Sequence, residues 1–389
     1  IGCQALEGDA STPTNATGSY NVAFGYHAGN KITSGGCNIF IGKQSGCKST
    51  TGTFNIAIGE GAASYCNLTG GNNIALGRNA GYFVSGGNRN LFLGLQAGKY
   101  ANSNDGIALG QEALGGSVSS GNDNIAIGCF AGHDMTSGSC NIIIGKGAAM
   151  DNQITGVNNI TIGTLAGCKL TAGCRNIHFG QCSGKCSTGG EDNITIGTKA
   201  GLQLGGNTHN NVIIGCNAAS GTGTLEHNIV IGYQAMLAST GAREANVIIG
   251  REAGCCLGNG WHNVLIGTCA GKNLCVACCN IAIGRHVQLP NASDKLQLAI
   301  GDGSNRWITG TCDFNVTLAG IATVTKATGV VEATKFCGDG SCLTGITASG
   351  TGAIGGLTIQ DEGSTVGTAG SVSCINFAGS AVAVTATTG

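Results

Sequence analysis

The five residues Asn124-Ile125-Ala126-Ile127-Gly128 recur unchanged at Asn55–Gly59 and at Asn280–Gly284. Near copies fill the chain around them, and neighbouring copies begin 16 to 18 positions apart. The sixteen copies begin at positions 21, 38, 55, 73, 90, 106, 124, 141, 159, 176, 193, 211, 228, 246, 263 and 280, and a degenerate copy follows at Gln297–Gly301. A fixed period of this kind is typical of a solenoid, in which each repeat forms one coil stacked on the next.

Two columns of the repeat carry the same residue in nearly every coil. Counting the Asn as column zero, that column is Asn in fifteen copies, with Gly106 as the exception, and column four is Gly in all sixteen. We expect the Gly to take a positive φ at a corner and the Asn side chains to stack as a ladder. The structural residues predicted in this way include Asn38, Asn55, Asn124, Asn141, Asn193, Asn280, Gly42, Gly59, Gly128, Gly145, Gly197 and Gly284.

Columns one and three are large and apolar in every copy, as in Ile39 and Ile41. Several Gly per unit and a mostly β-branched pair favour strand over helix. Alternate side chains of a strand face opposite sides, so these two columns share a face. We expect that face to fill the interior of the coil.

Column two is also mostly apolar, and only Thr161, His178 and Thr195 interrupt it. A strand that is apolar on both faces is buried on both faces. Because a narrow solenoid has one interior, we predict that column two packs against other copies of the chain around a symmetry axis. The predicted axis residues include Ala57, Phe92, Ile143, His178, Ile213, Ile248 and Leu265. Burial alone predicts an oligomer and does not fix its order.

Composition agrees with an all-β stack of tight turns. The 389 residues include 71 Gly and 2 Pro but only 19 Lys or Arg and 20 Asp or Glu, whereas about 25% of an ordinary domain is charged. The net charge of -1 gives no basic footprint for nucleic acid, and no apolar run is long enough to cross a membrane. Sixteen coils at about 4.8 Å each would make a stiff rod of about 75 Å.

Four regions are predicted along the chain. Residues 1–20 form a partial coil and a loop, and residues 21–287 form the sixteen solenoid coils. Residues 288–348 form a β-rich connector, since the Ala of column seven is lost at Val287 and Pro290 cannot donate to a ladder. Residues 349–389 are a C-terminal β module rich in Gly, Thr and Ser. Because the first residues match the middle of a repeat, we interpret the chain as part of a longer protein.

The chain holds 21 Cys, and those of the sixteen coils avoid columns zero to four and column seven. They therefore lie at corners and in return loops. Three interpretations stay open: disulfide staples between coils or chains, a metal site, and free thiols used as small apolar residues. The densest group is Cys255, Cys256, Cys269, Cys275, Cys278 and Cys279. Its one C-x2-C spacing, beside two adjacent pairs, is a weak metal pattern.

No catalytic constellation is evident in the sequence. Acidic residues are scattered, and the adjacent pairs Glu191-Asp192 and Asp361-Glu362 fit solvated turns better than the facing carboxylates of a glycosidase. The seven His are dispersed as well. We therefore expect a non-enzyme with no catalytic residue, cofactor or bound metal.

The Asn-Ile-Ala-Ile-Gly unit, followed by two variable residues and Ala or Ser, resembles the head repeat of YadA-type trimeric autotransporter adhesins. The resemblance covers residues 21–287. It implies a left-handed parallel β-roll in which three chains lie side by side, and the trimeric order predicted here comes from this resemblance. The present repeat is longer than that of the adhesin heads, so its return loops differ.

Three stretches beyond the repeats, Asn305–Gly310, Ala333–Ile346 and Asp361–Ser371, resemble bacteriophage tail fibres, especially those of marine phages. This resemblance implies a homotrimeric, extracellular fibre of the virion that spaces or presents receptor-binding surfaces. Its partners would be other tail or fibre proteins and an unidentified host receptor. The alternatives are the head or stalk of a bacterial surface adhesin and a free extracellular filament.

Overall fold

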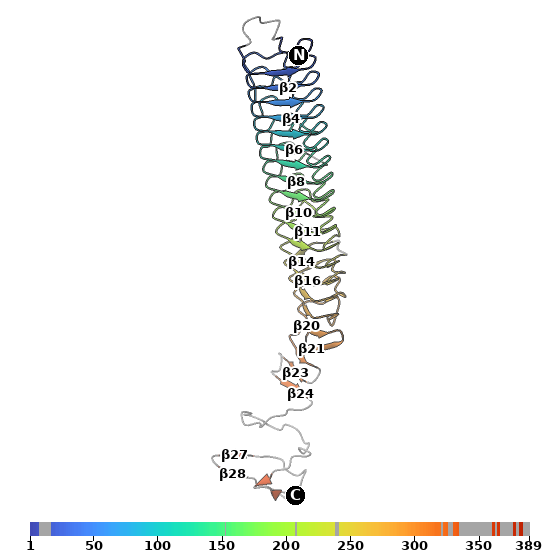
Figure 1. Cartoon of the computed structure of the whole chain (residues 1–389). Helices are drawn as coiled ribbons and strands as arrows, with labels where there is room; N and C mark the ends of the chain where they lie inside the picture. Colours follow the sequence, from blue (N-terminus) through green and yellow to red (C-terminus); the bar gives the residue numbers. More distant parts are fainter. Residues whose placement is uncertain are drawn as a thin grey trace. The chain divides into compact units, whose positions relative to one another are not determined.

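The computed structural model describes residues 1–7, 17–151, 153–206, 208–237 and 241–319, and beyond them the backbone of short strands only. The chain divides into two compact units, residues 1–334 and 335–389. The first unit contains the solenoid (Figure 1). The described elements are all strands, and among these residues no helix is long and apolar enough to span a membrane.

Each pentapeptide copy forms one three-residue strand made of columns one to three. These strands are β1 (Val22–Phe24), β2 (Ile39–Ile41), β3 (Ile56–Ile58), β4 (Ile74–Leu76), β5 (Leu91–Leu93), β6 (Ile107–Leu109), β7 (Ile125–Ile127), β8 (Ile142–Ile144), β9 (Ile160–Ile162), β10 (Ile177–Phe179), β11 (Ile194–Ile196), β12 (Val212–Ile214), β14 (Ile229–Ile231), β16 (Val247–Ile249), β18 (Val264–Ile266) and β19 (Ile281–Ile283). Every strand pairs in parallel with the next, column against column, as Ile125 with Ile142 between β7 and β8. The predicted parallel β-solenoid is confirmed.

A second, shorter parallel sheet forms on the return side of three consecutive coils. It consists of β13 (Leu225–Glu226), β15 (Arg243–Glu244) and β17 (Gly260–Trp261). Glu226 pairs with Glu244, and Glu244 with Trp261. The return segments of neighbouring coils therefore also lie in register.

The parallel stack ends at the degenerate copy. Strand β20 (Leu298–Asp302) pairs in parallel with β19 and antiparallel with β21 (Asn305–Gly310). An antiparallel meander of β22 (Val316–Leu318), β23 (Ala322–Thr325) and β24 (Val330–Ala333) follows. The change of section predicted after Val287 is thus seen one coil later.

The second unit contributes two short antiparallel pairs to the description. They are β25 (Gln360–Asp361) with β26 (Ser364–Thr365), and β27 (Asn376–Ala378) with β28 (Ala381–Ala383). Residues 334–346 of the stretch that resembles tail fibres, the C-terminal module outside these strands and loop residues 8–16 lie outside the described residues.

The predicted Asn ladder is present and buried. The backbone N–H and the Nδ2 of Asn141 both donate to Oδ1 of Asn124, at 3.0 and 3.1 Å, and Nδ2 also donates to the carbonyl of Gly156 at 3.0 Å. The same pattern continues unbroken to Asn280. In the one coil where Gly106 replaces the Asn, the backbone N–H of Gly106 still donates to Oδ1 of Asn90 at 2.8 Å. The ladder thus satisfies polar groups that the coil interior would otherwise leave unpaired.

The glycines of column four take φ values from 123° to 138°. A Cβ atom added to any of these sixteen residues would lie between 1.8 and 2.8 Å from the backbone of the next Gly in the column, or of Gly301 at the end of the series. The predicted corner is confirmed, and both the φ value and the close stacking of coils exclude other residues.

The structure reverses the predicted use of the two strand faces. Column two lies inside the coil of a single chain, and its members are between 0 and 8% exposed. The predicted axis residues Ala57, Phe92, Ile143, His178, Ile213, Ile248 and Leu265 are all at most 1% exposed without any partner chain. They cannot line an axis between chains, so this prediction was wrong.

The physical reason lies in the return segment, which supplies the space for column two. Gly98 has a φ of 58° and packs so closely that a Cβ there would lie 2.2 Å from Cδ1 of Phe92. Gly46 meets Phe40 in the same way, at 2.5 Å. Large side chains of column two are therefore accommodated within the chain. Columns one and three, predicted to fill the interior, point outward instead.

Candidate functional site: an apolar face along the strands

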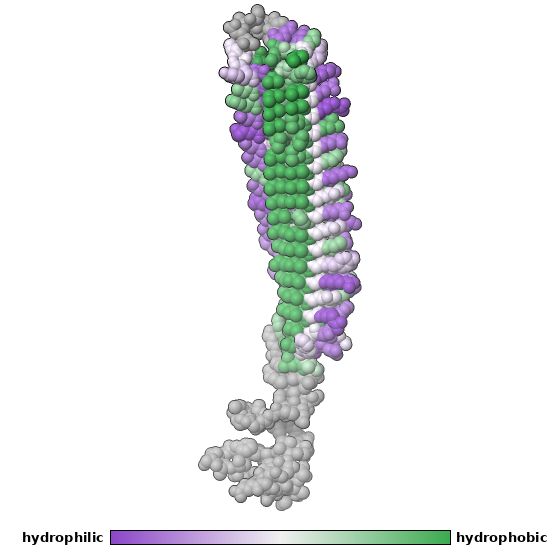
Figure 2. All heavy atoms as spheres, in the orientation of Figure 1, coloured by the Kyte–Doolittle hydropathy of each residue, from purple (hydrophilic) through white to green (hydrophobic). Residues whose placement is uncertain are grey.

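The outward side chains of columns one and three in the sixteen three-residue strands form one continuous surface, here called the apolar face. Figure 2 shows it as an unbroken hydrophobic band running along the stacked strands. Its members are half-buried or exposed, with Phe24 at 55%, Leu93 at 46% and Phe179 at 50%. Only Ile, Leu, Val and Phe occupy these two columns.

The extent of the apolar face is unusual for a chain that stays alone in water. About thirty side chains, each exposing several tens of Å², give an apolar surface on the order of 2,000 Å², whereas the largest patch on a typical monomer is about 300–600 Å². A stable interface buries about 800 Å² on each partner. The face is therefore large enough to hold another macromolecule.

Two exposed ion pairs outside this face join successive coils. Lys43 Nζ lies 3.1 Å from Glu60 Oε1, and Arg89 Nε lies 2.7 Å from Asp105 Oδ1. The Arg89 guanidinium, by hydrogen bond and charge, holds the pKa of the Asp105 carboxyl below its ordinary value. Because both pairs are exposed, each contributes little to stability. They give the coil a polar exterior outside the apolar face.

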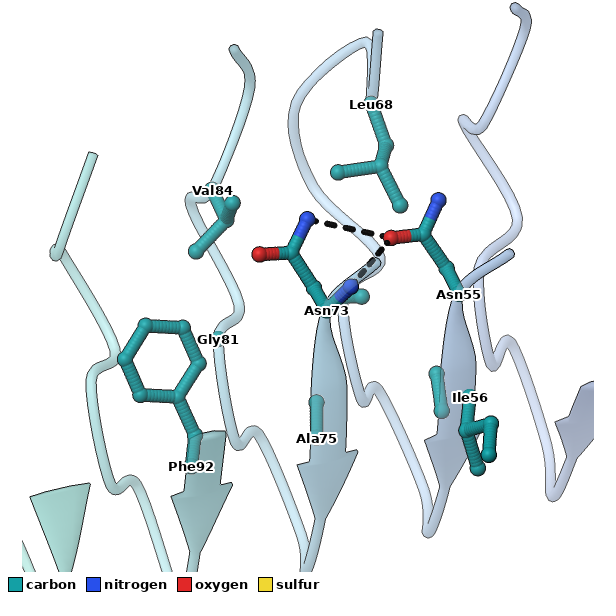
Figure 3. A pocket seen from close by; sticks show the side chains of 10 residues that line it. Asn55, Ile56, Leu68, Asn73, Ala75, Gly81, Val84 and Phe92 are labelled. Carbon is teal, nitrogen blue, oxygen red and sulfur yellow. Dashed lines mark hydrogen bonds between the residues drawn. The ribbon is translucent and has the colours of Figure 1, made fainter. Parts of the chain in front are cut away.

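One small void between the coils leaves no room for a ligand. Figure 3 shows this void between neighbouring coils, with Leu68, Val84 and Phe92 around it and the Asn55–Asn73 rung beside it. Its volume is about 10 Å³, and a water molecule needs about 10–15 Å³ together with polar partners. The void is therefore a packing defect.

A polar layer crosses the interior at three successive coils. Nδ1 of His178 and Oγ1 of Thr195 share a hydrogen bond of 2.7 Å, and Ser183 Oγ lies 2.7 Å from the same Thr195 oxygen. His178 Nε2 and Thr161 Oγ1 are buried without a partner among the described residues. Burial lowers the pKa of His178 to about 4, so the imidazole is neutral near pH 7.

This layer predicts that the solenoid is less stable in acid. The folded pKa of His178 lies below the ordinary value of 6.5, so the unfolded chain binds the proton more tightly. The contribution of neutral His178 to the free energy of unfolding is complete above pH 6.5. It is lost as the pH falls toward 4, by roughly 2–3 kcal/mol at pH 4.5. Urea unfolding at pH 7.0 and 4.5 measures this loss. The variant His178→Leu should show a loss smaller by that amount, and equal losses in both proteins would contradict the prediction.

The described part of the single chain holds no disulfide between coils, and staples between chains stay a prediction. The eighteen described Cys, including all six of the predicted cluster, are free. Sγ of Cys255 and Sγ of Cys256 are 3.7 Å apart, well beyond the bond length of about 2.05 Å. Burial and the neighbouring Cys256 raise the pKa of Cys255 to about 11. Within the described part of the chain, no group of three or more His, Cys, Asp or Glu side chains is arranged to hold a metal ion.

Two side-chain clusters were missed by sequence reasoning. Ring centroids of Tyr65 and Phe83 are 4.5 Å apart, those of Phe83 and Tyr100 are 4.6 Å apart, and Lys48 Nζ lies 4.2 Å from the Tyr65 centroid. Because Phe83 stacks on Tyr100 and Lys48 lies over the ring of Tyr65, these side chains connect successive coils. All four residues lie in column ten, and this shared position in the repeat was the signal that could have revealed the cluster.

The second cluster places an imidazole between two carboxyl groups. His133 Nε2 lies 3.3 Å from Glu112 Oε2, and His133 Nδ1 lies 2.9 Å from Asp134 Oδ1. Glu112 and His133 come from successive coils and different columns, so their sequence spacing did not indicate a pair. Glu191 and Asp192, predicted as a solvated turn, both pair with Arg175.

Comparison with known proteins adds no family to this description. No protein-family model matches the chain, and no curated protein sequence matches it. The function proposed below is therefore supported by the repeat, the apolar face and the sequence resemblances described above.

Proposed function

We propose that this chain is part of a homotrimeric fibre of a bacteriophage tail, in which the solenoid is a rigid shaft that spaces or presents host-binding surfaces. The observation that carries the proposal is the apolar face. A shaft needs lateral support along its whole length, and this face offers it at every coil from β1 to β19.

The occupant of the apolar face is a second copy of the same chain. The face carries only Ile, Leu, Val and Phe, so charge neither directs nor opposes self-association. Its side chains repeat at the spacing of parallel strands, about 4.8 Å, and only a partner with the same repeat matches that spacing along its whole length. Another copy satisfies this condition without further assumptions.

The number of copies and the biological setting rest on resemblance. The YadA-type repeat favours three chains, and the stretches Asn305–Gly310, Ala333–Ile346 and Asp361–Ser371 favour a tail fibre over an adhesin. In this proposal the protein is extracellular, is carried by the virion, contacts other tail or fibre proteins and has no catalytic role. A bacterial surface adhesin is the second candidate, favoured by the repeat alone.

Three measurements test the proposal. Sedimentation equilibrium of the purified chain should give three times the monomer mass, and a monomer at micromolar concentration would refute the assembly. Immunogold electron microscopy of the natural source should label tails of virions, whereas label on cell envelopes would favour the adhesin. Purified protein incubated with host polysaccharide should release no reducing sugar.

A further inference from the structure

A hollow of about 410 Å³ opens at the C-terminal end of the solenoid, lined by Trp261 and by the loop residues Ser293, Asp294 and Lys295. Val276 also lines it, and Cys278 and the buried Ala277 complete the wall. Its volume falls within the range of about 300–1,000 Å³ that is typical of small-molecule sites. It lies on the return side of the coils, where β17 ends.

The hollow combines exposed apolar surface with polar groups. Trp261 is 48% exposed and Val276 is 55% exposed. Among the described residues, no aromatic ring or cation packs on the indole. Among the described residues, the Asp294 carboxylate and the Lys295 ammonium have no hydrogen-bond or ion-pair partner. These groups are therefore free to meet a ligand.

Both walls of the hollow are fixed to the Asn ladder. The carbonyl of Ala277 accepts from Asn263 Nδ2 at 3.0 Å. The carbonyl of Asp294 accepts from Asn280 Nδ2 at 3.2 Å and from Gln297 Nε2 at 2.8 Å. Gln297 further braces the loop through both backbone groups of Asn291. The site is thus held in place before any ligand arrives, which lowers the entropic cost of binding.

We propose that this hollow binds a sugar ring of a neutral glycan. The negative face of an indole attracts the polarised C–H edge of a sugar ring. The carboxylate of Asp294 accepts from sugar hydroxyls, while Lys295 and the Ser293 hydroxyl donate to them. Because the hollow offers one carboxylate and one ammonium, it favours a polyhydroxylated neutral ligand over an anion or a cation. The inference rests on the proposed function, since the glycan would belong to the host surface.

The test uses tryptophan fluorescence of the assembled protein. The chain has two Trp, so the variant Trp307→Phe leaves Trp261 as the one indole. Glucose, galactose, mannose, N-acetylglucosamine and short oligomers of each are titrated into it. At least one should give a saturable change in emission. If no saccharide in this set does so, the inference is wrong.

Variants separate sugar binding from assembly. By isothermal titration with the responding saccharide, Trp261→Ala should weaken binding at least tenfold, as should Asp294→Ala, while Trp307→Ala should leave it unchanged. All three should sediment as the unaltered protein does. Sugar binding that survives in Trp261→Ala would overturn the inference. Loss of assembly in that variant would also overturn it, because Trp261 would then belong to an interface between chains. Failure of sugar binding with an intact trimer leaves the proposed shaft standing.

Discussion

Two glutamates on the apolar face should convert the assembled fibre segment into monomers. Ile41 and Ile58 occupy column three of adjacent coils, pair in register and are 36% and 38% exposed in the single chain. In a monomer, Ile41→Glu and Ile58→Glu place their carboxylates in water. In the assembly the same carboxylates would be buried against apolar neighbours, at a cost of several kcal/mol each. Sedimentation equilibrium should show a threefold fall in mass, with the β-type circular dichroism spectrum retained.

A matched control places the same charges elsewhere on neighbouring coils. Ser34 and Thr51 both lie in column thirteen and are exposed. The pair Ser34→Glu and Thr51→Glu adds the same charge and should leave the mass unchanged. If the apolar-face pair remains as large an assembly as the control pair, the apolar face is not the interface.

The second large effect is expected at the glycine corner. Gly145 has a φ of 133°, and a Cβ there would lie 2.5 Å from the carbonyl oxygen of Gly163 in the next coil. Gly145→Ala combines a backbone conformation nearly restricted to glycine with overpacking against backbone. Together these should lower the free energy of unfolding by roughly 3–6 kcal/mol, which is a large part of the 5–15 kcal/mol of a typical domain. Urea unfolding followed by circular dichroism measures the change.

Gly86 provides the comparison for this substitution. It lacks a positive φ, and a Cβ there would have only Thr69 Oγ1 near it, at 3.9 Å. Gly86→Ala should therefore change the unfolding free energy by less than about 0.5 kcal/mol. Because solenoid coils unfold locally, hydrogen exchange should place the weakening in coils next to Gly145. Equal stability of the two alanine variants would show that the corner tolerates a side chain.

Local repeat chemistry was predictable from the sequence. Sixteen aligned copies revealed the strand, the glycine corner of Gly128 and the ladder that joins Asn124 to Asn141. These features depend on residues that are fixed in every copy and act through their own backbone or the next coil. The left-handed φ values in columns minus one and six, as at Arg89 and Leu165, were not predictable, because those columns carry many residue types.

The choice between the two strand faces needed the tertiary structure. Alternation separated column two from columns one and three but did not say which side faces inward, since both are apolar. That choice is made by the return segment, where Gly98 leaves space for Phe92 inside the coil.

The sequence by itself thus determined a parallel solenoid of about 17 residues per coil, its Asn and Gly columns and an apolar strand on both sides. Only the tertiary structure decided that Ile41 and Ile58 point outward and that Trp261 and Asp294 line the same hollow. The reason is physical: a repeat pattern fixes which side chains share a face, while the path of the returning chain decides which face is enclosed.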